Sequence, residues 1–180
     1  MSVAIDAMVL IWGLQKPHHK GKKATNQDVA DMRRRAKLLL RTLAEAKETV
    51  VVPAIVVSEV LLGIRPAEHG EFIAALQEHF FMPPFDVRAA SLAAQLWLET
   101  RELPKEQQPA RTTLKADVLI VATAKVAGAE VFYSHDGNFR KLAGRAGMRG
   151  EDLPTHSENL FIDAEARREA EEEERAGPNH

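Results

Sequence analysis

Val3-Ala4-Ile5-Asp6 is the stretch that decides the fold, because it joins three small or β-branched apolar residues directly to an aspartate. A short apolar run of this kind is typical of a buried strand. An aspartate at the end of that strand would lie at the carboxyl edge of a sheet, where open α/β sheets bind their ligands. The simpler interpretation is that Asp6 only caps the next helix, since Asp is a favoured N-cap residue.

Two later segments of the 180-residue chain support a sheet of several such strands. Residues 49–53 read Thr-Val-Val-Val-Pro, a β-branched run closed by proline, and residues 130–136 are largely apolar and end in Asp136. Elsewhere, apolar residues recur at three- and four-residue steps, which predicts helices. We expect helices near residues 7–12, from 26 or 28 to 47, 55–63, 66–80, 88–101, 114–126 and 138–146, and a last short strand within 149–160.

The alternation of strands with helices predicts a single α/β domain with a central, mainly parallel sheet. Crossover connections between parallel strands are right-handed. The strands that end in Asp6 and Asp136 can therefore lie side by side, with both carboxylates at the same edge of the sheet.

The composition indicates a globular domain, with 45% hydrophobic and 28% charged residues. The chain has no cysteine, which excludes disulfides and thiolate metal sites and fits a reducing compartment. The sequence shows no signal-peptide pattern, and no apolar run approaches the roughly 18 residues that a membrane helix needs. We therefore expect a cytoplasmic protein without a membrane partner.

The charges are distributed unevenly along the chain. Residues 16–41 contain nine lysines or arginines and only two aspartates, whereas residues 163–175 contain seven acids and three arginines. Such asymmetry suggests a basic region that faces a polyanion and an acidic tail, although each can simply be a solvated helix face. The arginines at 33–35 lie mostly off the apolar stripe of the helix expected there. For a nucleic-acid backbone, the predicted contacts are Lys20, Lys22, Lys23, Arg33 and Arg34.

Glu59 and Asp117 lie within otherwise apolar helical segments, where a carboxylate is costly to bury unless it is paired or coordinated. They can cap helices or pair with Arg65 or Lys115. Alternatively, they join Asp6 and Asp136 in holding Mg²⁺ or Mn²⁺, which take oxygen ligands and relieve the repulsion between clustered carboxylates.

A divalent cation in such a cleft suits phosphodiester hydrolysis, because it lowers the pKa of a bound water and stabilises the leaving oxygen. The sequence contains neither a Gly-x-Ser-x-Gly nucleophile motif nor a P-loop or Gly-x-Gly-x-x-Gly nucleotide motif. From the residues alone, a metal-dependent nuclease is one hypothesis, and scattered structural carboxylates of an α/β protein are the other.

Four segments, taken in order, resemble the PIN domain, and most of all the VapC-type toxin ribonucleases. They are Asp6 after its strand, Ser58-Glu59-Val60-Leu61, Ala116-Asp117-Val118-Leu119-Ile120-Val121-Ala122-Thr123-Ala124, and Ser134-His135-Asp136-Gly137-Asn138-Phe139. The resemblance covers about residues 1–150. It implies a three-layer α/β/α domain that cleaves RNA with Mg²⁺ or Mn²⁺. By the same resemblance, Asp6, Glu59 and Asp117 are metal ligands, Asp136 completes the set directly or through water, Ser134 orients neighbouring carboxylates, and Asn138 is a lesser polar neighbour.

The resemblance also implies a homodimer and a cognate antitoxin that inserts a peptide into the acidic pocket. We expect a PIN-like nuclease domain over residues 1–160, with a basic insertion at about 13–28, and an acidic C-terminal extension over 161–180. The alternatives are a PIN nuclease of RNA maturation, one that acts on DNA, or a non-catalytic PIN domain that binds RNA or protein. The complete set of four acids argues against a mere binder, since clustered negative charge repels a polyanion.

Overall fold

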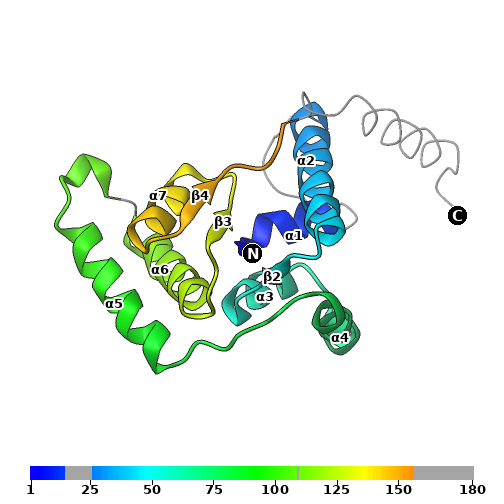
Figure 1. Cartoon of the computed structure of the whole chain (residues 1–180), viewed down its shortest axis with the longest axis horizontal. Coiled ribbons are helices and arrows are strands. Elements are labelled where there is room, and N and C mark those ends of the chain that lie inside the picture. The colour runs from blue at the N-terminus through cyan, green and yellow to red at the C-terminus, as the bar shows by residue number, and fades with distance from the viewer. Residues whose placement is uncertain (15–25, 109, 156–180) are drawn as a thin grey trace, which may run out of the picture.

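The fold is a three-layer α/β/α arrangement around a four-stranded sheet in which every strand is parallel to its neighbours, as predicted (Figure 1). The structure is a computed structural model that describes residues 1–14, 26–108 and 110–155. The strands are β1 (Ser2–Ile5), β2 (Thr49–Val51), β3 (Val131–Tyr133) and β4 (Arg149–Glu151), in the order β2-β1-β3-β4. The predicted neighbours β1 and β3 do lie side by side, with Ile5 opposite Tyr133.

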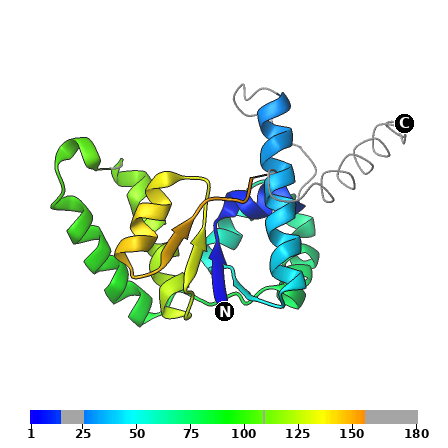
Figure 2. The same cartoon turned by 45° about the horizontal axis from the view of Figure 1, so that its top comes forward.

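Helices cover both faces of this sheet. In Figures 1 and 2, α2 and α4 lie on the side of the molecule opposite α5. Helix α5 packs on α6, and α1 packs on α2 and α3. The helices are α1 (Ala7–Leu14), α2 (Asn26–Glu45), α3 (Ala54–Leu61), α4 (His69–His79), α5 (Val87–Arg101), α6 (Arg111–Val126) and α7 (Gly137–Arg145), with short 3₁₀ turns at Pro66–Glu68 and Lys105–Gln107.

The core forms around β1, whose Val3, Ala4 and Ile5 are completely buried. The strands on either side contribute Val51 and Phe132, which are also fully buried. Burial on both faces is the reason that these strands are continuous apolar runs with no alternation of polar residues. Among the described residues, no helix combines the length and the apolarity needed to cross a membrane.

The helix bounds differ from the sequence prediction by one to three residues, most clearly at the start of α6. Helix α6 begins at Arg111, three residues before the expected start, and its first turn is closed by the Leu114 N–H donating to the Ala110 carbonyl at 2.9 Å. Packing against α5 overrides the weak helix propensity of the threonines at 112–113. Phe81 lies in the expected extended segment, but it also pairs with Val51 in a parallel bridge at the edge of the sheet.

The expectation that the arginines at 33–35 lie off the apolar stripe is wrong for Arg35, which is 9% exposed. Its Nε donates to the carbonyl oxygen of Pro154 at 3.1 Å, so the aliphatic stem is buried while the charged head is hydrogen-bonded. The predicted contacts Lys20, Lys22 and Lys23 lie outside the described residues. The acidic extension over 161–180 lies outside them as well, and the domain boundaries stay predictions.

We predict that Gly150→Ala destabilises the fold. A Cβ atom at this position of β4 would stand 2.3 Å from the backbone carbonyl oxygen of Arg140 and 2.7 Å from its Cα, where no side-chain movement can relieve the clash. Overpacking of this kind costs about 1–3 kcal/mol, and the melting temperature should fall by several degrees.

The matched control is Gly70→Ala in α4, where an added Cβ meets nothing within 4 Å. Thermal unfolding followed by circular dichroism should show this control to be as stable as the wild type or slightly more stable. Equal melting temperatures for the two variants would contradict the close approach of β4 to α7.

Candidate active site

Asp6 is buried at the carboxyl end of β1, with 4% of its surface exposed. One carboxylate oxygen accepts a hydrogen bond from the Val9 N–H at 3.1 Å and so caps α1, while the other accepts from the hydroxyl of Ser134. Burial raises the pKa of Asp6 above its usual value, although these hydrogen bonds act in the opposite direction. The helix-capping interpretation is therefore correct, and it does not exclude a place for Asp6 in a site.

Ser134 joins the two strand ends. Its hydroxyl is fully buried just after β3, donates to Asp6, and accepts from the Asp136 N–H at 3.0 Å. Asp136 in turn caps α7 by accepting from the Asn138 N–H at 2.7 Å. The ends of β1 and β3 and the start of α7 are thus connected through the Ser134 hydroxyl group and the carboxylates of Asp6 and Asp136.

Glu59 and Asp117 approach the same edge from α3 and α6. Burial raises the pKa of Asp117 to about 7, and the negative charges of Asp136, Glu59 and Asp6 add to this shift. Burial also raises the pKa of Glu59, with a further contribution from Asp6. The four predicted carboxylates therefore lie close enough together for the charges of Asp6, Glu59 and Asp136 to disfavour the ionisation of Asp117.

The structural partners considered for these two acids do not pair with them. Arg65 forms its ion pair with Glu68, and Lys115 is exposed. Within the described residues, neither Glu59 nor Asp117 forms an ion pair with either side chain. Burial and nearby negative charges thus disfavour the ionised forms of Glu59 and Asp117, and perturbed carboxylates of this kind make the edge of the sheet a candidate functional site.

The donor set fits Mg²⁺ or Mn²⁺, since it offers only carboxylate oxygens, which are the ligands that these hard cations prefer. Mutual repulsion among the acids is the physical reason that a cation would be held, because the ion offsets it. Within the described part of the chain, no three acidic or histidine side chains already stand in a ligating arrangement. The carboxylates are therefore close enough to interact through their charges, and their side chains would have to move to bind one ion together.

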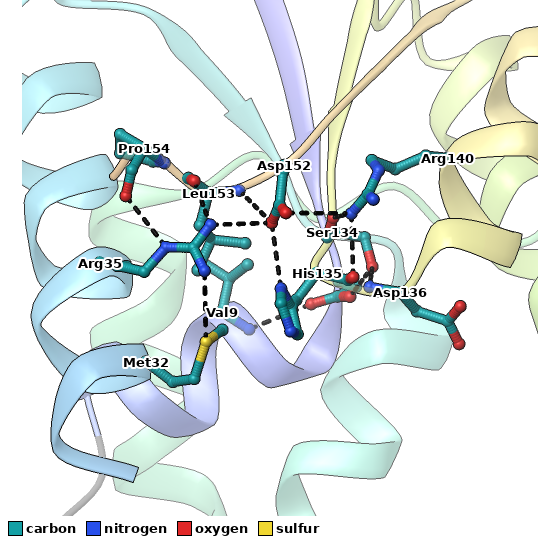
Figure 3. Close-up of polar contacts among 11 residues, drawn as sticks. Val9, Met32, Arg35, Ser134, His135, Asp136, Arg140, Asp152, Leu153 and Pro154 are labelled. Atoms are coloured by element: carbon teal, nitrogen blue, oxygen red, sulfur yellow. Dashed lines mark hydrogen bonds and ion pairs between the residues drawn. The ribbon is translucent and has the colours of Figure 1, made fainter. Parts of the chain in front are cut away.

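A second polar network lies beside the acids and was not predicted from the sequence (Figure 3). Asp152 lies just after β4 and is hydrogen-bonded to His135 Nδ1 at 3.1 Å. It also forms ion pairs with Arg35 Nη2 at 3.1 Å and with Arg140 Nη1 at 3.5 Å. Partial burial acts to raise the pKa of Asp152, but the hydrogen bonds from His135 and from the Leu153 N–H, together with the two arginines, lower it overall.

This network holds the loop that carries the site. Arg140 donates to the carbonyl oxygens of Ser134 at 2.8 Å and His135 at 2.9 Å, which fixes the backbone between β3 and Asp136. Arg35 ties the segment after β4 to α2. The position of Arg35, three residues after Met32 and four before Leu39, placed it next to the apolar stripe and was the signal that could have revealed its burial.

Comparisons with known proteins agree with this geometry. The sequence model of the PIN domain family matches residues 3–145. A comparison with curated proteins gives no match.

Solved structures with the same fold include VapBC2 from Rickettsia felis bound to a DNA fragment from their promoter, and DNA-bound VapBC from Salmonella typhimurium. The first is 13% identical with a TM-score of 0.58, over 86% of this chain and all of the matched chain. The second is 15% identical with a TM-score of 0.54, over 86% of this chain and 99% of the matched chain. At such identities the likeness shows the fold.

We predict that Asp117→Asn stabilises the metal-free protein at neutral pH. The folded-state pKa of Asp117 is about 7, above its usual 3.8, so the folded protein holds this proton more tightly than the unfolded chain. Stability should therefore fall as the pH rises from about 4 to about 7. After allowance for solvent screening, the variant should gain about 1 kcal/mol, or about 2–4 °C in melting temperature, at pH 7.5.

The measurement is a series of thermal melts between pH 5 and 8 in EDTA. Asp31→Asn is the control, since Asp31 forms only a surface pair with Arg34 at 3.4 Å and should change stability by less than about 0.5 kcal/mol. If the stability of Asp117→Asn depended on pH as steeply as that of the wild type, Asp117 would not be the group that causes this dependence.

Proposed function

This chain belongs to the PIN domain family, and on that basis we propose that it is a Mg²⁺- or Mn²⁺-dependent endoribonuclease that acts as the toxin of a toxin–antitoxin pair. The observation that carries the proposal is the approach of Asp6, Glu59, Asp117 and Asp136 to one edge of the sheet, where burial and the charges of the other three acids raise the pKa of Asp117 to about 7. Clusters of acids that include a carboxylate with a strongly raised pKa are typical of functional sites.

In this proposal the four carboxylates hold the cation, with Asp136 acting directly or through water. When bound, the ion would polarise the phosphate and lower the pKa of the attacking water. Ser134 orients Asp6 and stabilises its ionised form through the hydroxyl hydrogen bond. Arg140 keeps the Ser134–Asp136 loop in place by binding two of its carbonyl oxygens. The chain supplies no covalent nucleophile in this scheme.

RNA is the substrate that we propose, and DNA is the alternative that the test must separate from it. Arg33 and Arg34 on α2 are candidate contacts for the backbone, together with the lysines at 20, 22 and 23 outside the described residues. Arg34 is half exposed and pairs with Asp31. A protein that only bound a polyanion would gain nothing from four carboxylates at the same edge.

We further propose that a cognate antitoxin binds this chain. Two of the structural neighbours are described as VapBC complexes, and both are bound to DNA. A groove of about 450 Å³ on the described surface offers an apolar contact for such a partner. Leu14, Leu40, Phe72, Leu76 and Phe80 line it.

Self-association as a homodimer belongs to the same proposal. Val87 and Leu98 lie three turns apart on α5, and their side chains are 85% and 62% exposed. Exposed apolar residues on one face of a helix are suited to a contact with a second copy.

We predict that the purified protein cleaves RNA from a cellular pool in Mg²⁺ or Mn²⁺ and that EDTA abolishes the cleavage. Asp117→Asn and Asp6→Asn should each lower the rate by at least about 100-fold, because each removes a charge that would hold the ion. Cleavage is measured by gel analysis and by sequencing of the cut ends, with single-stranded DNA of matched sequence run in parallel.

Glu71→Gln in α4 is the control for loss of a carboxylate far from the site, and it should cleave like the wild type. Cleavage that persists in EDTA, or in both aspartate variants, would refute the proposal. Faster cleavage of DNA than of RNA would support a nuclease but would identify DNA, and not RNA, as its substrate.

A further inference from the structure

Asp117 of the acidic site also lines a small cavity of about 30 Å³ between α5, α6 and α7. In Figure 1 these three helices lie on the side of the molecule away from α2. Its lining includes Asp117 of α6 and Thr100 of α5, and α7 contributes Asn138, Lys141 and Arg145. The cavity therefore joins one of the four carboxylates to two basic side chains that the proposed chemistry does not use.

The three α7 residues lie on one face of the helix, because they are spaced by three and four positions. Helix α7 begins at Gly137, immediately after Asp136. With a rise of 1.5 Å per residue, Lys141 stands about 6 Å and Arg145 about 12 Å along the helix from that point. The face thus runs outward from the acidic site as a short track of basic groups.

Arg145 is held in place across this cavity. Its Nη1 donates to the hydroxyl of Thr100 at 3.0 Å, and Thr100 is only 2% exposed. A guanidinium has five N–H donors, so one anchors the side chain and the others remain for a ligand. Lys141 is exposed. Within the described residues, neither Lys141 nor Arg145 forms an ion pair with an acid.

We propose that Lys141 and Arg145, assisted by the amide of Asn138, form a subsite for a phosphate of the RNA backbone next to the phosphate that is cleaved. This rests on the proposed function. A polyanion that crosses the carboxylate edge is repelled there, and two cations beside Asp117 offset that repulsion where the strand enters or leaves. Arginine and lysine are the usual phosphate ligands, and arginine adds directed N–H donors. The subsite positions the strand and takes no part in the chemical step.

The test measures RNA binding in EDTA and cleavage in Mg²⁺ for Lys141→Ala, Arg145→Gln and the double variant. Arg145→Gln removes the charge but keeps an amide donor for Thr100, so the contact between α5 and α7 can persist. We expect Kd and KM to rise about fivefold to tenfold for each single variant, with kcat changed by less than twofold. The salt dependence of log Kd should become shallower by about 0.7 for each lost phosphate contact.

Arg88→Ala is the charge-matched control, since Arg88 is an exposed arginine on α5 that pairs with Asp86. Its Kd, KM and salt dependence should equal those of the wild type. Thermal melts check that each variant is folded.

The decisive arm uses RNA oligonucleotides that carry a single neutral methylphosphonate at successive positions. In the wild type, neutralising one phosphate other than the cleaved one should weaken binding about fivefold to tenfold, and in the double variant the same change should have no further effect. If the effects of the methylphosphonate and of the double variant simply multiply, or if the variants bind like the wild type, the subsite is refuted.

The two proposals can fail separately. If the wild type cleaves RNA and the Lys141 and Arg145 variants have the same Kd and KM as the wild type, the subsite is refuted and the ribonuclease proposal stands. RNA binding that depends on Lys141 and Arg145, without metal-dependent cleavage, would overturn the ribonuclease and leave the subsite. A wild type that neither binds nor cleaves RNA would overturn both.

Discussion

The burial of the Asp6 carboxylate at the end of the central strand is the constraint on which the rest of the structure depends. A carboxylate that is 4% exposed must have its oxygens hydrogen-bonded, and here one caps α1 while the other accepts from Ser134. Both partners exist only if α1 begins directly after β1 and if β3 lies beside β1 in the observed register. The same hydrogen bonds that satisfy Asp6 therefore bring Asp136, which follows Ser134, to the edge of the sheet.

The fold would be more stable with neutral residues in place of Glu59 and Asp117, because burial and nearby negative charges oppose the ionisation of these two acids. Natural proteins accept such a cost at functional sites. The surrounding structure limits it: the backbone N–H groups at the starts of α1 and α7 solvate Asp6 and Asp136, and the arginines around Asp152 fix the loop between β3 and α7. The site is thus rigid where it meets the sheet and highly charged where a cation would bind.

The sequence predicted the sheet, most helices and the edge position of Asp6 and Asp136 because these depend on local patterns and on one rule of parallel topology. The approach of Glu59 and Asp117 to the same edge depends on how α3 and α6 pack, which the sequence reached through resemblance to a family. The contact between Arg35 and Asp152 was missed because the two residues are 117 positions apart and Asp152 has no local signature. Lys141 and Arg145 were missed because two basic residues on an amphipathic helix look like any solvated face until their place beside Asp117 is seen.

The most direct test of the central claim, that the four carboxylates form one site for a divalent cation, is calorimetric titration of the wild type with Mn²⁺ at pH 6.5 in two buffers of different ionisation enthalpy. The account predicts binding of Mn²⁺ with release of part of a proton, because the pKa of Asp117 is about 7 without the ion. Glu59→Gln should weaken the binding, and Asp117→Asn should abolish the proton release. Binding without proton release, or equal binding by both variants, would contradict the account.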